Sequence, residues 1–282
     1  MRITPFQALA CPLDGTPLRC TGSAWTCASG HSFDIASQGY TNLLPVQHKR
    51  SRDPGDSKEM VAARRRFLAA GFYQPIAAAV SQAVLADLPA DATISCLDAG
   101  CGEGYYLRQL AAEAGNAQTL ALLGLDISKW AVLSAAKQDK RVTWVVGSNA
   151  KLPVLPGTLD RVLCLFGFPV YPEFARVLKP GGRLVQVDAG PDHLRELREI
   201  IYPSLKPERP ADLQTPAGFC RLPTESLRFS IGLTRADQIA DLLAMTPHLF
   251  RASAEGRVAA AALTALSLNM DLRLTCFERD PD

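Results

Sequence analysis

The sequence predicts an α/β fold, in which a mostly parallel, Rossmann-like sheet carries helices on both faces and a small cysteine-bearing module precedes it. Apolar strands alternate with helical patterns from about residue 93 onward, which is typical of a parallel sheet covered on both faces. The first of these strands runs into a glycine-rich turn, LDAGCGEGYY. Residues 1–47, by contrast, are turn-rich and hold three of the eight cysteines. The net charge of +2 singles out no class of partner.

The first 92 residues form two of the three zones that we expect. Residues 1–47 are the small module, in which TPLRC and AWTC predict a hairpin that turns at Gly22. Residues 48–92 are a basic loop followed by a helical linker, with helices expected at about 57–70 and 75–88.

Residues 93–282 form the main domain, in which the sequence predicts a seven-stranded sheet. The expected strands, in chain order, are TISCLDAG, LALLGLDIS, VTWVVGS, RVLCLFGF, RLVQVDAG, SLRFSIGL and LNMDLRLTCFER. The expected helices are YYLRQLAAEA, KWAVLSAAKQ, PEFARVL, PDHLRELREII and residues 235–244. No run approaches the ~20 apolar residues that span a bilayer, and the N-terminus lacks a signal-peptide pattern. We therefore expect a cytoplasmic protein with no membrane contact.

The glycine-rich turn predicts a ligand site at the carboxyl ends of the strands. Glycines let the backbone turn sharply and approach a ligand, and the following helix N-terminus offers N–H donors. Asp98 ends the first strand of the array, and Asp126 ends the second, where it can accept hydrogen bonds from a ribose. The spacing is GxGxG rather than the GxGxxG of dehydrogenases. Because Asp98 would repel a pyrophosphate, a cationic ligand suits the site better.

This ordered set of motifs resembles the class I S-adenosylmethionine-dependent methyltransferases over residues 93–282. The resemblance implies that Asp126 holds the ribose of S-adenosylmethionine, and that Ser148 and Asn149 contact the adenine. Ordinary loop polarity is the alternative for Ser148 and Asn149. The methionine part would be framed by Asp98, Gly100, Gly102, Glu103 and Gly104.

Four stretches narrow the resemblance to the bacterial 23S rRNA (guanine-N1)-methyltransferases: residues 33–60, ARRRFLAAGFYQP, LDAGCGEGYY and GPDHL. The resemblance implies a zinc-binding N-terminal module that helps to hold 23S rRNA, methyl transfer to N1 of one guanine in an rRNA hairpin, and a homodimer. The positions implied to contact the cofactor are Tyr73, Gly102, Glu103 and His193. Tyr73 could instead pack within the linker and hold it in place, and His193 could simply be exposed to solvent.

A basic stretch agrees with RNA as the partner. Residues 48–66 hold seven Lys or Arg against three Asp or Glu, and Lys and Arg make the phosphate contacts that dominate nucleic-acid affinity. A solvated helix face is the favoured alternative for Arg64–Arg66, because three successive helical residues point in different directions. The candidate RNA-binding residues are His48, Lys49, Arg50, Arg52, Arg64 and Arg65.

Methylation at guanine N1 requires a proton acceptor and a platform for the base. Neutral guanine carries a proton on N1, which a carboxylate can take, so Asp188 and Asp192 are catalytic candidates. The alternative is that these carboxylates lie on the surface or cap a helix. Asp192 is well placed to cap the helix that begins near His193. The stretch FGFPVY follows the fourth strand and offers Phe166, Phe168 and Tyr171 for stacking on a base. Core packing competes with that role, above all for Phe166.

A metal site is predicted in the small module, with one unusual ligand. Cys11, Cys27 and His31 match a zinc ribbon, but Asp14 occupies the place of the second cysteine. A carboxylate can bind zinc, although structural sites prefer thiolate. Cys20 would sit ~7 Å along its strand from the metal end of the hairpin, so we exclude it as a ligand. A metal-free module held by apolar packing is the alternative.

Two other functions compete with rRNA methylation. One is a class I methyltransferase that acts on a small molecule and uses the N-terminal module as a lid. The other is an RNA-binding or ribosome-assembly protein that keeps the cofactor fold without turnover.

Overall fold

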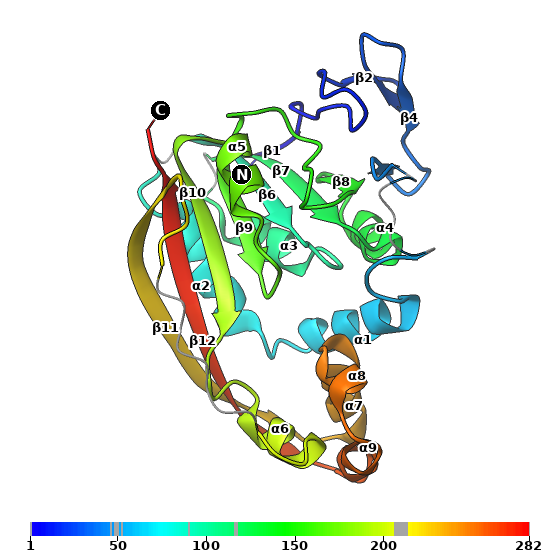
Figure 1. Cartoon of the computed structure of the whole chain (residues 1–282), viewed down its shortest axis with the longest axis vertical. Helices are drawn as coiled ribbons and strands as arrows, with labels where there is room; N and C mark the ends of the chain where they lie inside the picture. Colours follow the sequence, from blue (N-terminus) through cyan, green and yellow to red (C-terminus); the bar gives the residue numbers. More distant parts are fainter. Residues whose placement is uncertain are drawn as a thin grey trace.

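A twisted sheet of nine strands runs through the part of the chain that the structure describes (Figure 1). This computed structural model describes residues 2–45, 47, 51, 53–89, 91–115, 118–205 and 214–281. The strand order is β11 (Phe219–Leu233), β12 (Leu266–Arg279), β10 (Leu178–Ala189), β9 (Leu159–Leu165), β6 (Thr93–Ala99), β7 (Thr119–Asp126), β8 (Thr143–Val146) and β5 (Tyr40–Asn42), and β1 (Arg2–Pro5) also pairs with β7.

The sheet is mostly parallel, as predicted, but it has two more strands than the seven expected. Every neighbouring pair from β10 to β5 is parallel, as is the pair of β1 and β7, whereas β12 runs antiparallel to both β10 and β11. The two additional strands, β1 and β5, come from the first 47 residues. Each is only three or four residues long, too short to show the alternation that identifies a strand in a sequence.

Helices cover both faces of the sheet, and each face has its own hydrophobic cluster. The helices α2 (Gln74–Leu85), α3 (Tyr105–Glu113) and α4 (Lys129–Gln138) pack on one face. The helix α5 (Tyr171–Val177) and the segment around Phe6 pack on the other. Side chains alternate along β6, so that Cys96 belongs to the first cluster and Leu97 to the second. Asp98 therefore returns to the face that carries α3.

The small module forms the predicted hairpin. Strands β2 (Arg19–Thr21) and β3 (Ala24–Thr26) pair with Cys20 opposite Trp25, and β4 (Ser32–Asp34) adds a third strand. The turn has Gly22 at a φ of 73°. Figure 1 shows this hairpin projecting beside the main sheet, while Leu9 bridges to Val154 of the main domain.

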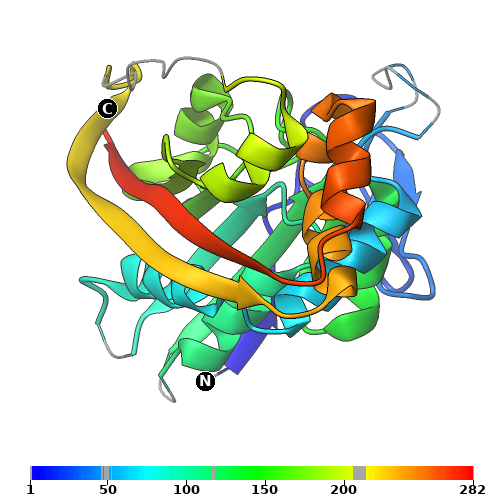
Figure 2. The same ribbon diagram turned by 90° about the horizontal axis from the view of Figure 1, so that it is seen from below.

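The C-terminal part forms a long ribbon and a cluster of helices. Strands β11 and β12 curve together along one side (Figure 2). The helices α6 (Arg195–Ile201), α7 (Ala236–Met245), α8 (His248–Arg251) and α9 (Ala254–Ala261) lie at one end of this ribbon. The linker helix α1 (Lys58–Ala69) packs against α7. This contact brings the linker to the carboxyl ends of the parallel strands.

A side chain caps the N-terminus of α1, but none caps the N-terminus of α6. Ser57 caps α1 by accepting a hydrogen bond from the Met60 N–H at 3.3 Å. The expectation that Asp192 caps α6 is wrong, because the N-cap is Leu194 in a left-handed conformation with no side-chain bond. Asp192 instead forms an ion pair with Arg195 at 2.8 Å.

Among the described residues, no single helix has the length and apolar character to cross a membrane, and α1 and α2 meet that test only when counted together across a bend of 85°.

Candidate active site

The glycine-rich turn joins β6 to α3 at the carboxyl edge of the sheet. Gly104 shows why glycine is needed there, because its φ is 83° and a Cβ atom would lie 2.5 Å from the Trp144 ring. The N–H of Gly102 donates to Asp126 at 2.9 Å, which ties the turn to the end of β7. A second N–H, from Ser128, donates to the other Asp126 oxygen at 2.8 Å. The carboxylate of Asp126 is thus fixed beside the turn.

Asp98 is the most unusual group of the site. Its side chain is 1% exposed, and neither carboxylate oxygen has a hydrogen-bond partner in the described structure. Burial raises the pKa of Asp98 to about 8, and the nearby charge of Asp126 adds to the rise. Burying a carboxylate without a partner costs folding free energy. A cationic ligand that pairs with Asp98 would therefore stabilise the folded chain.

Three further buried polar atoms without a partner lie around the same edge. They are the Tyr106 hydroxyl, Nδ1 of His193 and Oδ1 of Asn149. Asn149 uses its amide nitrogen to bond the Ala99 carbonyl at 3.3 Å, which leaves its oxygen available. Buried polar atoms are almost always paired. Their concentration here indicates a polar ligand with donors and acceptors spread along the strand ends. Ser148, the neighbour of Asn149, accepts a bond from the Ala150 N–H instead.

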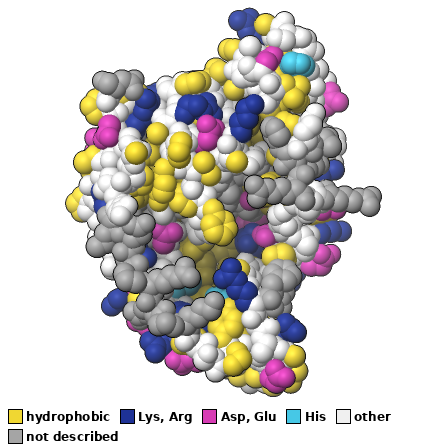
Figure 3. All heavy atoms as spheres, viewed as in Figure 1, with side chains coloured by type: hydrophobic (Ala, Val, Ile, Leu, Met, Phe, Trp, Pro, Cys, Tyr) yellow, Lys and Arg dark blue, Asp and Glu magenta, His cyan; other side chains and the backbone are white. Residues whose placement is uncertain are grey.

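Aromatic rings form one wall of the site. Phe166 lies between Tyr73 and His193, with ring centroids 6.1 Å from each, and it stacks on the imidazole. Burial lowers the pKa of His193 to about 4, with the charge of His248 contributing, so the ring is neutral at pH 7. Core packing, which we favoured for Phe166, is wrong, because this side chain is 41% exposed. Figure 3 shows a hollow with a hydrophobic floor on this face, bordered by basic and histidine side chains.

Two residues of FGFPVY occupy different environments. Phe168 is 88% exposed, so nothing in the fold requires its ring. Tyr171 packs edge-on against Phe219 and Phe277 and donates its hydroxyl to Gln186 at 3.1 Å. The three aromatic residues of this stretch therefore do not share one surface, and Phe168 presents the most accessible ring.

Glu103 points away from this group of residues. Its buried carboxylate accepts two bonds from Arg108, at 3.0 and 2.8 Å, and a third from Gln138 at 2.5 Å. Both partners also bond the Glu103 carbonyl. The side chain thus joins α3 to α4, and only the backbone N–H of Glu103 is left to face a ligand at the turn.

The candidate RNA-binding residues divide into three groups. His48, Lys49, Arg50 and Arg52 lie outside the described residues. Arg65 is exposed on α1 and lines a groove of about 560 Å³ between α1 and α4, together with Trp130 and Lys137. Arg64 turns the other way, toward the glycine-rich turn, where its Nη1 lies 3.5 Å from the Cβ position of Gly102.

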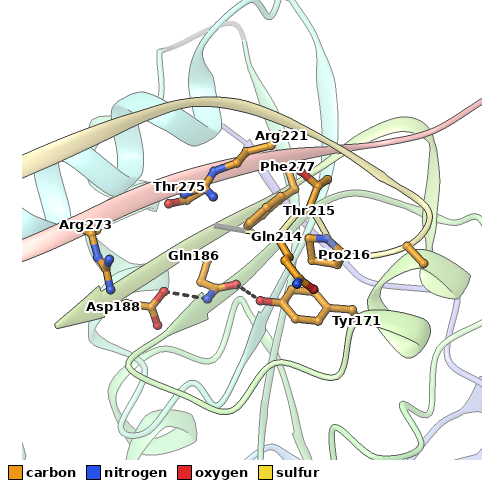
Figure 4. A pocket seen from close by; sticks show the side chains of 11 residues that line it. Tyr171, Gln186, Asp188, Gln214, Thr215, Pro216, Arg221, Arg273, Thr275 and Phe277 are labelled. Atoms are coloured by element: carbon orange, nitrogen blue, oxygen red, sulfur yellow. Dashed lines mark hydrogen bonds between the residues drawn. The ribbon is translucent and has the colours of Figure 1, made fainter. Parts of the chain in front are cut away.

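Of the two carboxylates considered for proton transfer, Asp188 lines a cavity. The cavity has a volume of about 390 Å³ and lies between β10, β12 and the segment 214–217 (Figure 4). Asp188 accepts a hydrogen bond from Gln186 at 2.7 Å, and Gln186 accepts one from Tyr171. Arg273 stands opposite Asp188 on the neighbouring strand. Asp192 is instead half-exposed and paired with Arg195.

The small module brings four metal-binding side chains together. One ligand atom from each of Cys11, Asp14, Cys27 and His31 lies within 4.8 Å of all the others. Nδ1 of His31 is 3.4 Å from each of the two thiol sulfurs and 3.2 Å from Oδ2 of Asp14. Cys20 is exposed and stands outside this group, as expected.

The two oxygens of Asp14 have separate roles. Oδ1 accepts bonds from the N–H and the hydroxyl of Thr16, at 3.0 and 2.6 Å, and these bonds lower the pKa of Asp14. Oδ2 is left facing Cys27 and His31. Burial acts against ionisation of Cys27, but hydrogen bonds from the backbone of His31 and from Thr16 and Ser29 lower its pKa to about 7. Two sulfurs, one oxygen and one imidazole nitrogen at this spacing fit tetrahedral zinc.

Comparison with known proteins agrees with this arrangement of module and domain. The zinc-ribbon family described as "RlmA, N-terminal" matches residues 9–52, and a methyltransferase domain family matches residues 96–182. A protein of Micromonospora griseorubida is 35% identical, covering 89% of this chain and 91% of its own length, and carries the name "Putative 23S rRNA (guanine-N(1)-)-methyltransferase".

Two further relatives give the same result. A protein of the same name from Bacillus subtilis, YxjB, is 32% identical over 71% of each chain. The 23S rRNA (guanine(748)-N(1))-methyltransferase of Streptomyces fradiae is 34% identical, covering 71% of this chain and 70% of its own. With this similarity, the zinc-ribbon match and the glycine-rich turn of a methyltransferase domain, the chain belongs to the 23S rRNA (guanine-N1)-methyltransferase family.

Proposed function

We propose that this chain transfers a methyl group from S-adenosylmethionine to N1 of a guanine in 23S rRNA. The names of its relatives support the reaction and the substrate. The observation that carries the proposal is the buried carboxylate of Asp98, which has no partner and lies directly before the glycine-rich turn. A cofactor with a positively charged end would supply the missing partner.

The residues at the strand ends fit S-adenosylmethionine, which when bound supplies an electrophilic methyl group. Asp98 would accept hydrogen bonds from its ammonium group, and Asp126 from its ribose hydroxyls, since a carboxylate oxygen can accept more than one bond. The unpaired oxygen of Asn149 would accept from the adenine amino group. Tyr73 and His193 would enclose the cofactor through the aromatic wall, which excludes water from the site. Gly100, Gly102 and Gly104 would let the backbone approach it closely.

The target guanine would bind on the aromatic side of the site. N1 lies on the Watson–Crick edge, so the base must be unpaired or extruded from its helix before it reacts. The exposed ring of Phe168 would stack on such a base. Asp188 stays the candidate acceptor for the N1 proton, with one oxygen held by the Gln186 amide, although the cavity that it lines opens on the α5 face of the sheet.

The rRNA would contact the basic groove between α1 and α4 as well as the small module. Lys58, Arg65 and Lys137 surround Trp130 in this groove, and cations beside an aromatic ring suit a nucleic-acid strand. We further propose that the module of Cys11, Asp14, Cys27 and His31 binds zinc. The roles of His48, Lys49, Arg50 and Arg52 in RNA binding, and the homodimer, stay predictions.

Primer extension on 23S rRNA tests the proposal. The protein is incubated with S-adenosylmethionine and protein-free 23S rRNA, and the rRNA is then copied with reverse transcriptase. A methyl group on N1 blocks Watson–Crick pairing, so we expect one new stop at a guanine that requires the cofactor. The Asp98→Ala variant is the matched control and should give no stop. Absence of any stop on naked rRNA, ribosomal subunits and assembly intermediates would overturn the proposal.

A further inference from the structure

Arg64 lies at the glycine-rich turn rather than on the outer surface of its helix. Its guanidinium Nη1 is 3.5 Å, and its Cδ 3.6 Å, from the position that a Cβ of Gly102 would take. Its side chain is only 24% exposed. The two arginines that follow it are exposed, and Arg66 pairs with Asp241 on α7. Arg64 is therefore the one arginine of this run that is directed into the candidate active site.

Two separate parts of the chain bond this guanidinium, and a third fixes one of them. Nη1 pairs with the carboxylate of Asp56, and Nη2 donates to the Met245 carbonyl at 3.0 Å. Asp56 is itself fixed, because its carbonyl accepts a bond from the Ser128 hydroxyl at 2.7 Å. Gly55, just before it, packs so closely on the loop after β7 that a Cβ would lie 2.9 Å from Ile127. A guanidinium has five N–H donors, and only two of them are used by these contacts.

An acidic and a basic side chain flank the turn. Asp98 is buried and unpaired on one side, and the Tyr106 hydroxyl beside it is also unpaired. Burial raises the pKa of Tyr106, Asp98 adds to the rise and Arg64 opposes it, so the anionic and the cationic side chains both act on this one phenol. An α-amino acid carries an ammonium and a carboxylate on the same carbon atom. A site with one carboxylate and one guanidinium around a glycine turn is complementary to such a group.

We propose that Arg64 binds the carboxylate of the methionine part of S-adenosylmethionine, and that Asp56 is a positioning residue that holds the guanidinium over Gly102. The inference rests on the proposed function only in requiring that the chain binds this cofactor. It removes Arg64 from the candidate RNA-binding residues. A planar guanidinium that is already oriented binds a carboxylate through two parallel hydrogen bonds, which gives Arg64 a role that lysine would fill poorly.

Calorimetric binding of two ligands tests this assignment. S-adenosylmethionine is compared with its decarboxylated analogue, which keeps the sulfonium, the amine and the adenosine. The wild-type protein should prefer the complete cofactor by ~10–100-fold, as expected for a charge-assisted pair. In Arg64→Ala this preference should fall to about one, because only the complete cofactor loses a partner. Arg64→Lys should retain part of it, and Asp56→Asn should lower it.

Arg235→Ala is the control, since this exposed arginine precedes α7 and pairs with Asp237. It should leave both affinities unchanged. A preference that survives in Arg64→Ala, or an equal loss of affinity for both ligands, would overturn the assignment and leave Arg64 a structural residue. Circular dichroism and thermal melting of each variant identify general unfolding, which would weaken both ligands together. A wild-type protein that binds neither ligand would overturn the proposed function itself.

Discussion

Replacing Asp98 with asparagine should stabilise the ligand-free protein while it destroys cofactor binding. The carboxylate is buried without a partner, and its pKa rises from 3.8 to about 8. A difference of about four pKa units corresponds to at most ~6 kcal/mol of folding free energy lost at alkaline pH. The amide of Asp98→Asn would also be buried and unpaired, at a cost of ~1–3 kcal/mol. We therefore expect a net gain of ~3 kcal/mol for the variant.

The effect depends on pH in a defined direction. The folded-state pKa of Asp98 lies above the unfolded value, so the penalty is absent below about pH 4, grows as the unfolded state ionises, and is complete above about pH 8. At pH 8.5 the thermal midpoint of Asp98→Asn should exceed that of the wild type by ~5–10 °C. At pH 5 the penalty on Asp98 is only ~1.5 kcal/mol, which the cost of the buried amide offsets, so the advantage should disappear. Calorimetry at pH 8.5 should also detect no binding of S-adenosylmethionine to the variant.

Asp160→Asn is the control for the loss of a partly buried carboxylate that has partners. Asp160 accepts bonds from the N–H and hydroxyl of Ser95 and pairs with Lys179. Burial acts against its ionisation, but these partners lower its pKa, so this variant should be less stable than the wild type at pH 8.5. If Asp98→Asn also lowers the thermal midpoint at pH 8.5, then Asp98 is paired in the folded protein, and no open ligand position lies beside it.

Three other predictions concern the zinc site, the stacking of the target guanine on Phe168, and the acceptor of the N1 proton. The purified protein should contain zinc, and Asp14→Cys should bind it at least ~10-fold more tightly in a chelator competition, because thiolate is the better ligand; equal affinities would exclude Asp14 as a ligand. Phe168→Ala should leave stability within ~0.5 kcal/mol but lower kcat/KM for rRNA by ~10-fold, and a change in cofactor affinity instead would contradict the stacking role. Asp188→Asn should lower kcat by ~10²-fold or more, with cofactor affinity unchanged; an unaltered kcat would exclude Asp188 as the base.

Periodicity and spacing were sufficient to predict most elements of the main domain. The two helices of the linker and the glycine-rich turn lie within a few residues of where the sequence predicts them, because strand and helix periods and glycine signals are local properties. The grouping of Cys11, Asp14, Cys27 and His31 could also be predicted, since their spacing matches a zinc ribbon. Hairpin geometry was sufficient to place Cys20 outside this group.

Side-chain direction at the site depended on tertiary packing and could not be predicted locally. Arg64 and Arg65 are neighbours on α1, yet the packing of α1 on α7 directs one to the glycine-rich turn and leaves the other in the outer groove. Glu103 follows the turn that we expected it to serve, but Arg108 and Gln138 take its carboxylate. A contact between residues distant in sequence leaves no periodic signal. The unpaired state of Asp98 was visible only in the folded chain.

Identification of the methylated nucleoside decides whether this chain methylates guanine at N1. 23S rRNA is incubated with the protein and S-adenosylmethionine carrying an isotopically labelled methyl group, and is then digested to nucleosides and analysed by mass spectrometry against authentic standards. We predict labelled 1-methylguanosine, at a yield that approaches one per rRNA molecule and disappears in Asp98→Ala. Label in a different nucleoside, or no label in rRNA although the cofactor binds, would contradict this prediction.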